Sequence, residues 1–348
     1  MKDISLQPFL FQPAAMPKVW GVGGIGERWE VSDMDEAPCT IVSGPYAGRT
    51  LREAVRSRPV EILGRSIAAR GPRLPLLLKT ITAAEALSIQ VHPGDDYARA
   101  VGDSEQGKTE AWVVLNADAG ARLILGLRPP ADRETFLKAL KETTPQQGNA
   151  MFKALCSSGA ISPEQFERAF SCPLGRLLNI VQVKRGDYVF LPAGALHAIC
   201  GGLTLYEIQQ ASDVTYRVYD WHRTDGNGKP RPLHLERALD VIDFSIVPTV
   251  ANLADSGREA TLVDSPHFIL EYSGFDGRKP LSVSAEKDTF AIVSAYEGTM
   301  EIRAGGGQAR LKEGQSALVP AAVAGAAVLI ARTRAAALIA RPGRLWKD

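Results

Sequence analysis

Two of the five histidines lie in segments whose residue types and spacing favour chemistry. In the segment Leu87-Ser-Ile-Gln-Val-His-Pro93, strand alternation places Ser88, Gln90 and His92 on one face and apolar residues on the other. The apolar face is expected to pack outward, so the polar face lines an interior. Because the following proline cannot continue the pairing, we expect His92 near the mouth of that interior. The alternative is an interior histidine that only completes hydrogen bonds.

A second segment, Gly107-Lys-Thr-Glu-Ala-Trp-Val-Val-Leu115, carries two charged residues at the start of an apolar strand. Lys108, Glu110 and Trp112 share one face of this strand. A glutamate in such a place is commonly an exposed edge residue. The lysine two positions away supplies a countercharge, and it also suits proton donation or contact with a phosphate. This segment alone specifies no reaction.

The third segment contains the other informative histidine and belongs to an internal repeat. Residues 186–197 read G-x5-P-x-G-x2-H, which is a turn glycine, a strand and a closing proline before His197. Residues 314–320 repeat the glycine, the five residues and the proline. In this second copy, Ala322 and Gly325 stand where the first has its second glycine and its histidine. We therefore expect two related β units, of which only the first binds a metal.

The elements that must position these residues are mostly short strands between turn signals. Strands at this density, without regularly alternating helices, favour an antiparallel barrel or sandwich over a doubly wound sheet. The expected strands are 76–81, 87–91, 111–115, 122–125, 178–183, 188–191, 203–209, 290–296 and 299–303.

Helices are expected in three places, and a boundary follows the last. Residues 50–63 have an amphipathic pattern, and a helical insertion lies near 129–172, with Ser162-Pro-Glu-Gln as its clearest start. The third helix covers 233–244. A small, polar stretch comes next, so we divide the chain into a catalytic domain and a C-terminal β domain without metal ligands. Their expected bounds are 1–248 and 249–348.

Composition narrows the classes of function. The chain has 348 residues, enough for about two domains, and a formal net charge of +1, too little for non-specific binding to nucleic acid. Its longest apolar tract is too short to cross a membrane, and its N-terminus lacks the apolar core of a signal peptide. The four widely spaced cysteines are typical of reduced thiols. We expect a cytoplasmic protein with no nucleic-acid partner and no membrane partner.

Together the three segments resemble one protein family. The third resembles the second motif of the cupin superfamily and departs from it at Gly201, where an asparagine is usual. The first cupin motif, His-x-His, is replaced by Gln-x-His ending at His92, with Lys-Thr-Glu downstream. That replacement is typical of the class I phosphomannose isomerases (mannose-6-phosphate isomerases), here of the short bacterial type. Further matches to this family lie at 18–21, 26–32 and 205–220.

The resemblance implies a fold and a metal site. The fold would be mainly β, with two cupin-like (jelly-roll) β-barrels and a small helical insertion, and only the first barrel would bind metal. Gln90, His92, Glu110 and His197 match the residues with which the family binds one divalent metal. Two imidazoles, a carboxylate and an amide oxygen make Zn2+ the first choice, while manganese, iron, cobalt and nickel also accept such donors.

The implied reaction interconverts mannose 6-phosphate and fructose 6-phosphate by moving a proton between C2 and C1 through an enediol intermediate. A metal with open positions would act as the Lewis acid. Glu207 shares a strand face with apolar residues, where burial raises a carboxyl pKa toward neutrality; an ion pair with a nearby lysine is the alternative. Lys108 suits proton transfer equally well if it is desolvated. The identity of the base stays open between these two.

Arg217 matches the family's catalytic arginine, and the alternative is a surface ion pair with Asp213 or Asp220. For substrate binding we expect Lys79, Ser88 and Asp213, with Arg217 also able to hold the phosphate. The implied partner is a small-molecule sugar phosphate, and the chain is expected to be a monomer or a homodimer.

Two other functions would use the same residues. An Fe(II)-dependent cupin oxygenase also binds its metal with two histidines and a glutamate and keeps positions open. A non-catalytic, sugar-phosphate-binding cupin regulator would keep the barrel without turnover. The basic residues near the metal positions favour an anionic substrate, and no site position is degraded, so the isomerase ranks first.

Overall fold

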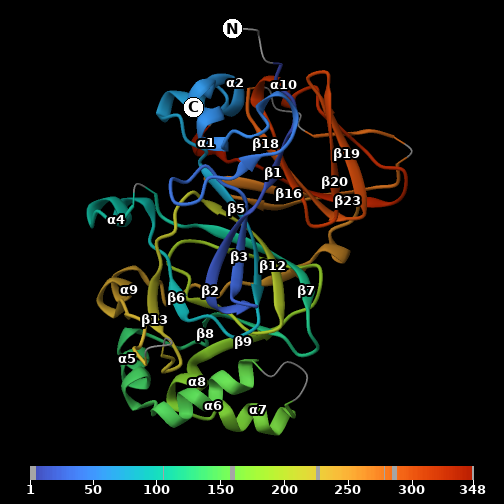
Figure 1. Ribbon diagram of the computed structural model, residues 1–348. Coiled ribbons are helices and arrows are strands. Elements are labelled where there is room, and N and C mark those ends of the chain that lie inside the picture. The colour runs from blue at the N-terminus through green and yellow to red at the C-terminus, as the bar shows by residue number, and fades with distance from the viewer. Residues whose placement is uncertain are drawn as a thin grey trace.

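Antiparallel sheets make up most of the protein (Figure 1). The computed structural model describes residues 5–104, 106–156, 161–224, 228–277, 279–283 and 288–346. In this part of the chain the strands form four sheets of seven, five, seven and four strands, and all pairings between them are antiparallel. The mainly β class predicted from the sequence is confirmed.

One seven-stranded sheet and the five-stranded sheet enclose the interior in which the predicted site residues lie. In spatial order the seven-stranded sheet contains β14 (Val250–Asn252), β10 (Asp187–Leu191), β7 (Glu110–Ala117), β12 (Leu203–Gln210), β5 (Leu76–Ala83), β2 (Ala14–Val22) and β3 (Ile25–Val31). The five-stranded sheet contains β13 (Tyr216–Tyr219), β6 (Ile89–Val91), β11 (His197–Ile199), β8 (Arg122–Leu127) and β9 (Leu178–Gln182).

The other two sheets form the C-terminal part of the molecule, in orange and red in Figure 1. The larger contains β15 (Glu259–Asp264), β16 (Phe268–Phe275), β23 (Ala335–Pro342), β18 (Ala291–Glu297), β21 (Ser316–Val319), β1 (Phe9–Gln12) and β4 (Thr40–Ile41). The smaller contains β17 (Leu281–Ser282), β22 (Val328–Ile330), β19 (Thr299–Ala304) and β20 (Gly307–Lys312). Small and aliphatic side chains fill the space between these two sheets.

The largest core joins the two seven-stranded sheets. Strand alternation on β12 sends Leu205 into the interior of the first two sheets and sends Tyr206 and Ile208 to the opposite face. On that face they meet Leu318 and Leu338 from the C-terminal sheet. The seven-stranded sheet that contains β12 is therefore apolar on the face toward the C-terminal sheet, and its polar side chains line the interior.

The N-terminal strand crosses into the C-terminal part of the molecule. β1 pairs with β21, so Phe9 lies opposite Leu318, and the blue strand is seen beside the red ones in Figure 1. The sequence prediction places its first strand at residue 76 and misses β1 to β4. Pro8, Pro13 and Pro17 interrupt this region, and the β2–β3 register shifts beside Pro17, which hides the period-2 pattern.

Helices cover the outer surfaces of the sheets. The predicted insertion is confirmed as α5 (Arg133–Glu142), α6 (Pro145–Cys156) and α7 (Pro163–Ala169), followed by α8 (Pro173–Leu177). The predicted start at Ser162 is confirmed by a capping box. The insertion packs on the outer face of the five-stranded sheet. The remaining helices are α1 (Leu51–Ser57), α2 (Pro59–Leu63), α3 (Arg65–Arg70), α4 (Asp95–Ala100), α9 (Leu235–Val241) and α10 (Ala321–Ala324).

Two of these helices divide a segment that the sequence predicts as one. The expected helix over 50–63 is interrupted between α1 and α2, where Arg58 adopts φ −144° and ψ 63°. Pro59 follows it, and a proline disfavours helical backbone in the residue before it. No described helix combines the length and apolar composition needed to cross a membrane.

The internal repeat corresponds to equivalent strands in the two halves. Gly186 has φ +87° and leads into β10, while Gly314 has φ +80° and leads into β21. After the first copy the chain continues into β11 and His197. After the second it forms the short helix α10 instead. The second copy therefore directs no metal-binding side chain to the matching place.

Phe9→Ala tests the role of the N-terminal strand. Phe9 has 0% of its surface exposed and packs on Tyr46 with a centroid separation of 5.3 Å. We expect the free energy of unfolding to fall by about 3 to 5 kcal/mol, measured by urea denaturation, because the buried ring leaves a cavity. Val22→Ala, at a residue that is 57% exposed, should change it by less than about 0.5 kcal/mol. Equal effects of the two variants would contradict the placement of β1.

Candidate metal centre and adjoining pocket

Three buried side chains from two facing sheets meet in the interior of the first unit. His197 begins β11, His92 follows β6, and Glu110 begins β7 in the opposite sheet. The Glu110 carboxylate lies 3.3 Å from His197 Nε2 and 3.7 Å from His92 Nε2. One potential ligand atom from each residue lies within 4.8 Å of the others. The sequence therefore predicted correctly that these three residues come together.

The backbone fixes the orientation of both imidazoles. His92 Nδ1 lies 2.8 Å from the carbonyl oxygen of Val214, and His197 Nδ1 lies 2.9 Å from that of Ala195. A carbonyl only accepts, so each Nδ1 donates and each neutral ring presents the lone pair of Nε2 to the interior. Burial lowers the pKa of His197 to about 4 and holds that of His92 well below its usual range. Both rings are therefore neutral near pH 7.

The donor set fits a divalent metal ion. His92 Nε2 and Glu110 Oε1 are buried and have no hydrogen-bond partner among the described residues, a costly state unless something else satisfies them. Two imidazole nitrogens and one carboxylate suit zinc, and the Nδ1 contacts to carbonyl groups are the outer support that metal-binding histidines use. Gln90 pairs with His197 across the strands, and its side-chain amide lies 3.3 Å from His197 Nε2.

Beside this cluster lies a row of buried charges. Lys108 Nζ is 2.9 Å from the Glu110 carboxylate and 4.0 Å from that of Glu207. Burial alone would lower the pKa of Lys108, but these two carboxylates outweigh it and raise the pKa. Burial and then Glu110 raise the pKa of Glu207, which accepts a hydrogen bond of 2.7 Å from Trp112 Nε1. Both readings of Glu207 from the sequence therefore have a counterpart: its pKa is raised, and Lys79 and Lys108 lie 3.8 Å and 4.0 Å from its carboxylate.

Lys79 continues the row and contacts three carboxylates. Its Nζ lies 3.3 Å from Asp213, 3.4 Å from Glu27 and 3.8 Å from Glu207, and only 2% of its side chain is exposed. These neighbours raise its pKa although burial opposes the charge. Glu27 also pairs with Lys18 at 3.0 Å. Burial would raise the pKa of Glu27, but the two lysines lower it to about 2.

Arg217 lines the pocket, and no ion pair between it and Asp213 or Asp220 is found among the described residues, although Asp220 lies near enough to act on its pKa. Its Nη1 donates to the carbonyl oxygen of Pro232 at 2.8 Å, and its buried Nε has no partner among the described residues. Asp220 instead accepts a hydrogen bond of 2.6 Å from Arg223 and two further hydrogen bonds from Nε and Nη2 of Arg231. Burial, and then repulsion from Arg231, lowers the pKa of Arg217.

A cavity of about 270 Å³ opens beside the metal cluster. Its lining brings together the residues predicted for catalysis and substrate binding, which are Lys79, Ser88, Lys108, Glu207, Asp213 and Arg217, and also Gln90, which was predicted as a metal ligand. It also contains residues to which sequence reasoning gave no role: Lys18, Trp20, Glu27 and Arg231. Lys18 and Glu27 could have been found from the sequence, because they lie in the segments 18–21 and 26–32 that match the family. No local pattern marks Arg231, because its position depends on a long-range contact with Asp220.

Comparison with known proteins shows what the chain resembles. The family model for the catalytic domain of type I phosphomannose isomerases matches residues 14–111. The mannose-6-phosphate isomerase of Streptococcus mutans is 30% identical over 330 residues, 90% of this chain and 92% of that protein. The crystal structure of the Bacillus subtilis mannose 6-phosphate isomerase is 27% identical, with a TM-score of 0.70 over 96% of this chain and 99% of that one.

A further solved structure shares the fold. It is a mannose 6-phosphate isomerase bound with zinc and yttrium, and it is 18% identical to this chain. Its TM-score is 0.67, over 97% of this chain and 99% of that one. The likeness extends over both halves of the molecule, so the C-terminal sheets belong to the shared architecture.

Glu27→Gln tests the buried charge row. Because the pKa of Glu27 falls from 4.5 to about 2 on folding, its ionised form stabilises the fold above about pH 4.5, and this stabilisation is lost as the pH falls toward 2. A shift of this size corresponds to about 3 kcal/mol. Urea denaturation should therefore show the variant less stable at pH 7, with the difference from wild type shrinking as the pH falls.

The matched control is Glu167→Gln, at an exposed glutamate of α7. It should change the free energy of unfolding by less than about 0.5 kcal/mol at any pH. A Glu27→Gln difference that stays constant between pH 7 and pH 2 would contradict the ion pairs assigned to Glu27.

Proposed function

This chain belongs to the family of type I phosphomannose isomerases, and we propose that the pocket beside His92, Glu110 and His197 is where it interconverts mannose 6-phosphate and fructose 6-phosphate. The observation that carries the proposal is the meeting of His92, Glu110 and His197, with unpaired polar atoms on His92 and Glu110, beside a cavity lined by lysine and arginine. A phosphorylated sugar needs both features, because its carbonyl must be polarised and its phosphate must be held.

The metal we propose is a single Zn2+, with Gln90 as the fourth ligand. Support comes from the two imidazoles and the carboxylate, and from the short separation of the Gln90 amide and His197 Nε2. The related structure that carries zinc has the same fold. When bound, such an ion polarises the sugar carbonyl and stabilises the negative charge that develops on its oxygen.

Proton transfer in the proposed reaction belongs to Glu207, with Lys108 as its partner. Isomerisation removes a proton from C2 or C1 of the open-chain sugar and returns it to the other carbon. Glu207 has a raised pKa, an oxygen without a hydrogen bond and a place in the cavity lining, which suits a group that takes and returns a proton. Lys108 stays protonated because of its carboxylate neighbours, so it donates hydrogen bonds to developing negative charge.

The phosphate in this proposal lies against Arg217, and Arg231, which two hydrogen bonds hold to Asp220, lies beside it. Lys79 is fully buried and already compensated by three carboxylates, so it lacks a free side for a phosphate dianion. Arg217 has an unpaired Nε and lines the cavity next to Arg231. Ser88 faces the same space and provides a hydroxyl, and Asp213 holds Lys79 in place from the mouth of the cavity. Arginine forks match phosphate oxygens well.

At the level of the whole chain, we propose two cupin-like jelly-roll units divided near residue 248. The repeat that places β10 and β21 in equivalent surroundings supports the pair of units, and the family's shared fold extends across both. β1 and β14 each pair with the other unit's sheet, which ties the two together. The four cysteines are free thiols, which fits the reducing cytoplasm.

Removing and restoring metal is the direct test. Conversion of mannose 6-phosphate to fructose 6-phosphate, followed with a coupled assay, should be lost after dialysis against a chelator and return with Zn2+. His197→Ala should bind no metal, whereas His222→Ala, at an exposed histidine, should bind one ion per chain. Oxygen consumption with Fe(II), or full activity in the metal-free protein, would overturn the proposal.

Arg217→Ala separates the phosphate contact from the metal site. We expect kcat/KM to fall by at least about a thousandfold, since a guanidinium in a buried site stabilises charge strongly. Metal content measured by atomic absorption should stay at the wild-type value, because Arg217 contacts none of the three cluster residues.

Two variants make this result specific. Arg217→Lys keeps the charge but not the fork, so it should recover only part of the lost activity. Arg176→Ala, at an exposed arginine of α8, should keep full activity. Loss of metal from Arg217→Ala would refute the placement of this residue beside, and outside, the metal cluster.

A further inference from the structure

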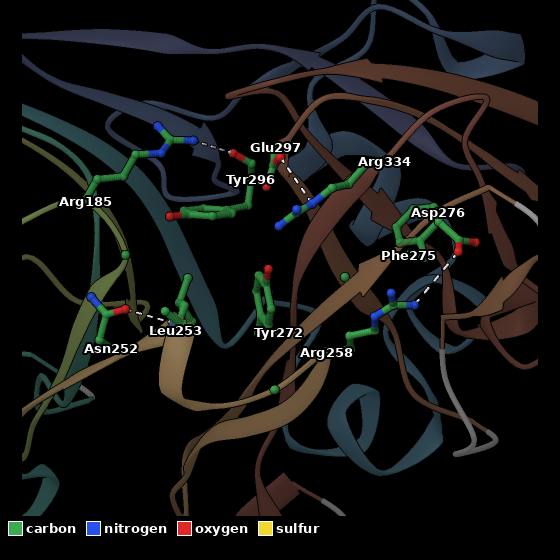
Figure 2. Close-up of a pocket in the computed structure, with 14 residues that line it drawn as sticks. Arg185, Asn252, Leu253, Arg258, Tyr272, Phe275, Asp276, Tyr296, Glu297 and Arg334 are labelled. Atoms are coloured by element: carbon green, nitrogen blue, oxygen red, sulfur yellow. Dashed lines mark hydrogen bonds and ion pairs between the residues drawn. The ribbon is translucent and has the colours of Figure 1, made fainter.

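A second and larger cavity lies at the seam between the two halves of the molecule, apart from the pocket described above. Its volume is about 830 Å³, and Figure 2 shows the side chains around it. One wall comes from the turn before β10 and from the segment after β14. The other wall comes from β16, β18 and the loop before β23. None of its lining residues lines the catalytic pocket.

Three arginines surround this cavity, and they are held differently. Arg185 bridges the seam, donating to the carbonyl oxygen of Leu115 at 2.6 Å and of Tyr296 at 3.2 Å, so it serves the structure. Arg258 and Arg334 have side chains that are 83% and 80% exposed, with nearest carboxylates at 3.9 Å and 3.6 Å. Such loose, exposed pairs contribute little, which leaves both guanidinium groups able to turn toward an anion.

Two tyrosines give the cavity a second, independent feature. Tyr272 and Tyr296 are 9% and 8% exposed, and their rings pack edge to face with a centroid separation of 6.0 Å. No hydrogen bond to either hydroxyl is found among the described residues. Burial raises the pKa of both, so both hydroxyls keep their protons. In Figure 2 the Tyr272 hydroxyl points to the side of the cavity where Arg334 lies.

The polar groups of this cavity suit a ligand that carries both an anion and hydroxyl groups. The two phenols and the two exposed guanidinium groups donate hydrogen bonds, which phosphate oxygens accept. The carboxylates of Asp276 and Glu297 accept hydrogen bonds, which sugar hydroxyls donate. The rings themselves are largely buried, and Arg185 lies 4.9 Å from the centroid of the Tyr296 ring, so the tyrosines offer the ligand their hydroxyls. A plain anion would use only half of these features.

We propose that the seam cavity is a second binding site for a phosphorylated hexose, held by Arg258, Arg334 and the hydroxyls of Tyr272 and Tyr296. Its volume of about 830 Å³ exceeds the volume of about 270 Å³ of the pocket proposed to bind the same ester. The ligand touches strands of both halves and stabilises the seam when it binds.

Counting bound ligand on the metal-loaded full chain tests the proposal. Equilibrium dialysis with fructose 6-phosphate, which the enzyme equilibrates with its isomer, should give two hexose phosphates per chain. Arg258→Ala/Arg334→Ala should weaken the second site by at least about tenfold, because two charge-assisted contacts are lost, and leave kcat/KM for isomerisation unchanged. Tyr272→Phe/Tyr296→Phe, which keeps both rings, should weaken it by about two- to tenfold.

Controls separate this site from the catalytic one. Arg332→Ala removes a neighbouring exposed arginine outside the cavity lining and should retain two sites. Arg217→Ala should lose the catalytic site and keep the seam site, so failure of either assignment is seen separately. One hexose phosphate per wild-type chain, or unchanged affinity in the double arginine variant, would overturn the proposal. Inorganic phosphate that binds as tightly as the ester would overturn the part played by the sugar.

Discussion

The site depends on mutual compensation of charges that are buried between two sheets. Three lysines, Lys18, Lys79 and Lys108, alternate with the carboxylates of Glu27, Glu207 and Glu110 in one continuous row. Each of these ions alone would cost several kcal/mol in such an interior, so none can be kept without its neighbours. The consequence for catalysis is that Lys108 stays charged while Glu207 holds a proton more readily than an exposed carboxylate. The same contacts thus give the pocket two groups: Lys108, which donates hydrogen bonds to a substrate oxygen, and Glu207, which takes a proton from carbon and returns it.

This interior exists because the strands around it have one polar face and one apolar face. On β12, Glu207 points inward, whereas Tyr206 and Ile208 point outward to the core shared with the C-terminal sheet. A sheet with one polar and one apolar face needs a cover for the apolar one. The C-terminal sheets supply that cover, and β1 strengthens it by joining them from the other end of the chain. The C-terminal sheets thus support the sheet that bears Glu110 and Glu207 from its apolar side, and none of their described residues lines the pocket.

Sequence reasoning identified the parts of the site that depend on local patterns. Alternation within a short strand placed His92 on an inward face, whereas the metal-binding roles of Glu110 and His197 came from the resemblance to the family. The same reasoning gave Lys79 a role in binding phosphate, but the structure shows this lysine paired with carboxylates from three separate strands and loops. It missed Arg231 and the strand that contains Phe9. Both failures have one cause. The residues that Arg231 and Phe9 contact lie more than ten positions away in sequence, and neither strand nor helix periodicity can predict such contacts.

The second copy of the repeat shows what a metal site demands beyond its ligands. Its strand and turn are preserved, yet the interior between the C-terminal sheets is filled by small and aliphatic residues such as Ala295, Ala337 and Ile302. Gly325 of this copy is an exposed residue at the end of α10, so no strand carries that position into the interior, and the core residues that fill the interior include no carboxylate. A metal-binding group buried there would have no compensating partner. A close-packed second unit and a polar first unit are therefore two stable outcomes of the same strand order, and the charge row is what distinguishes them.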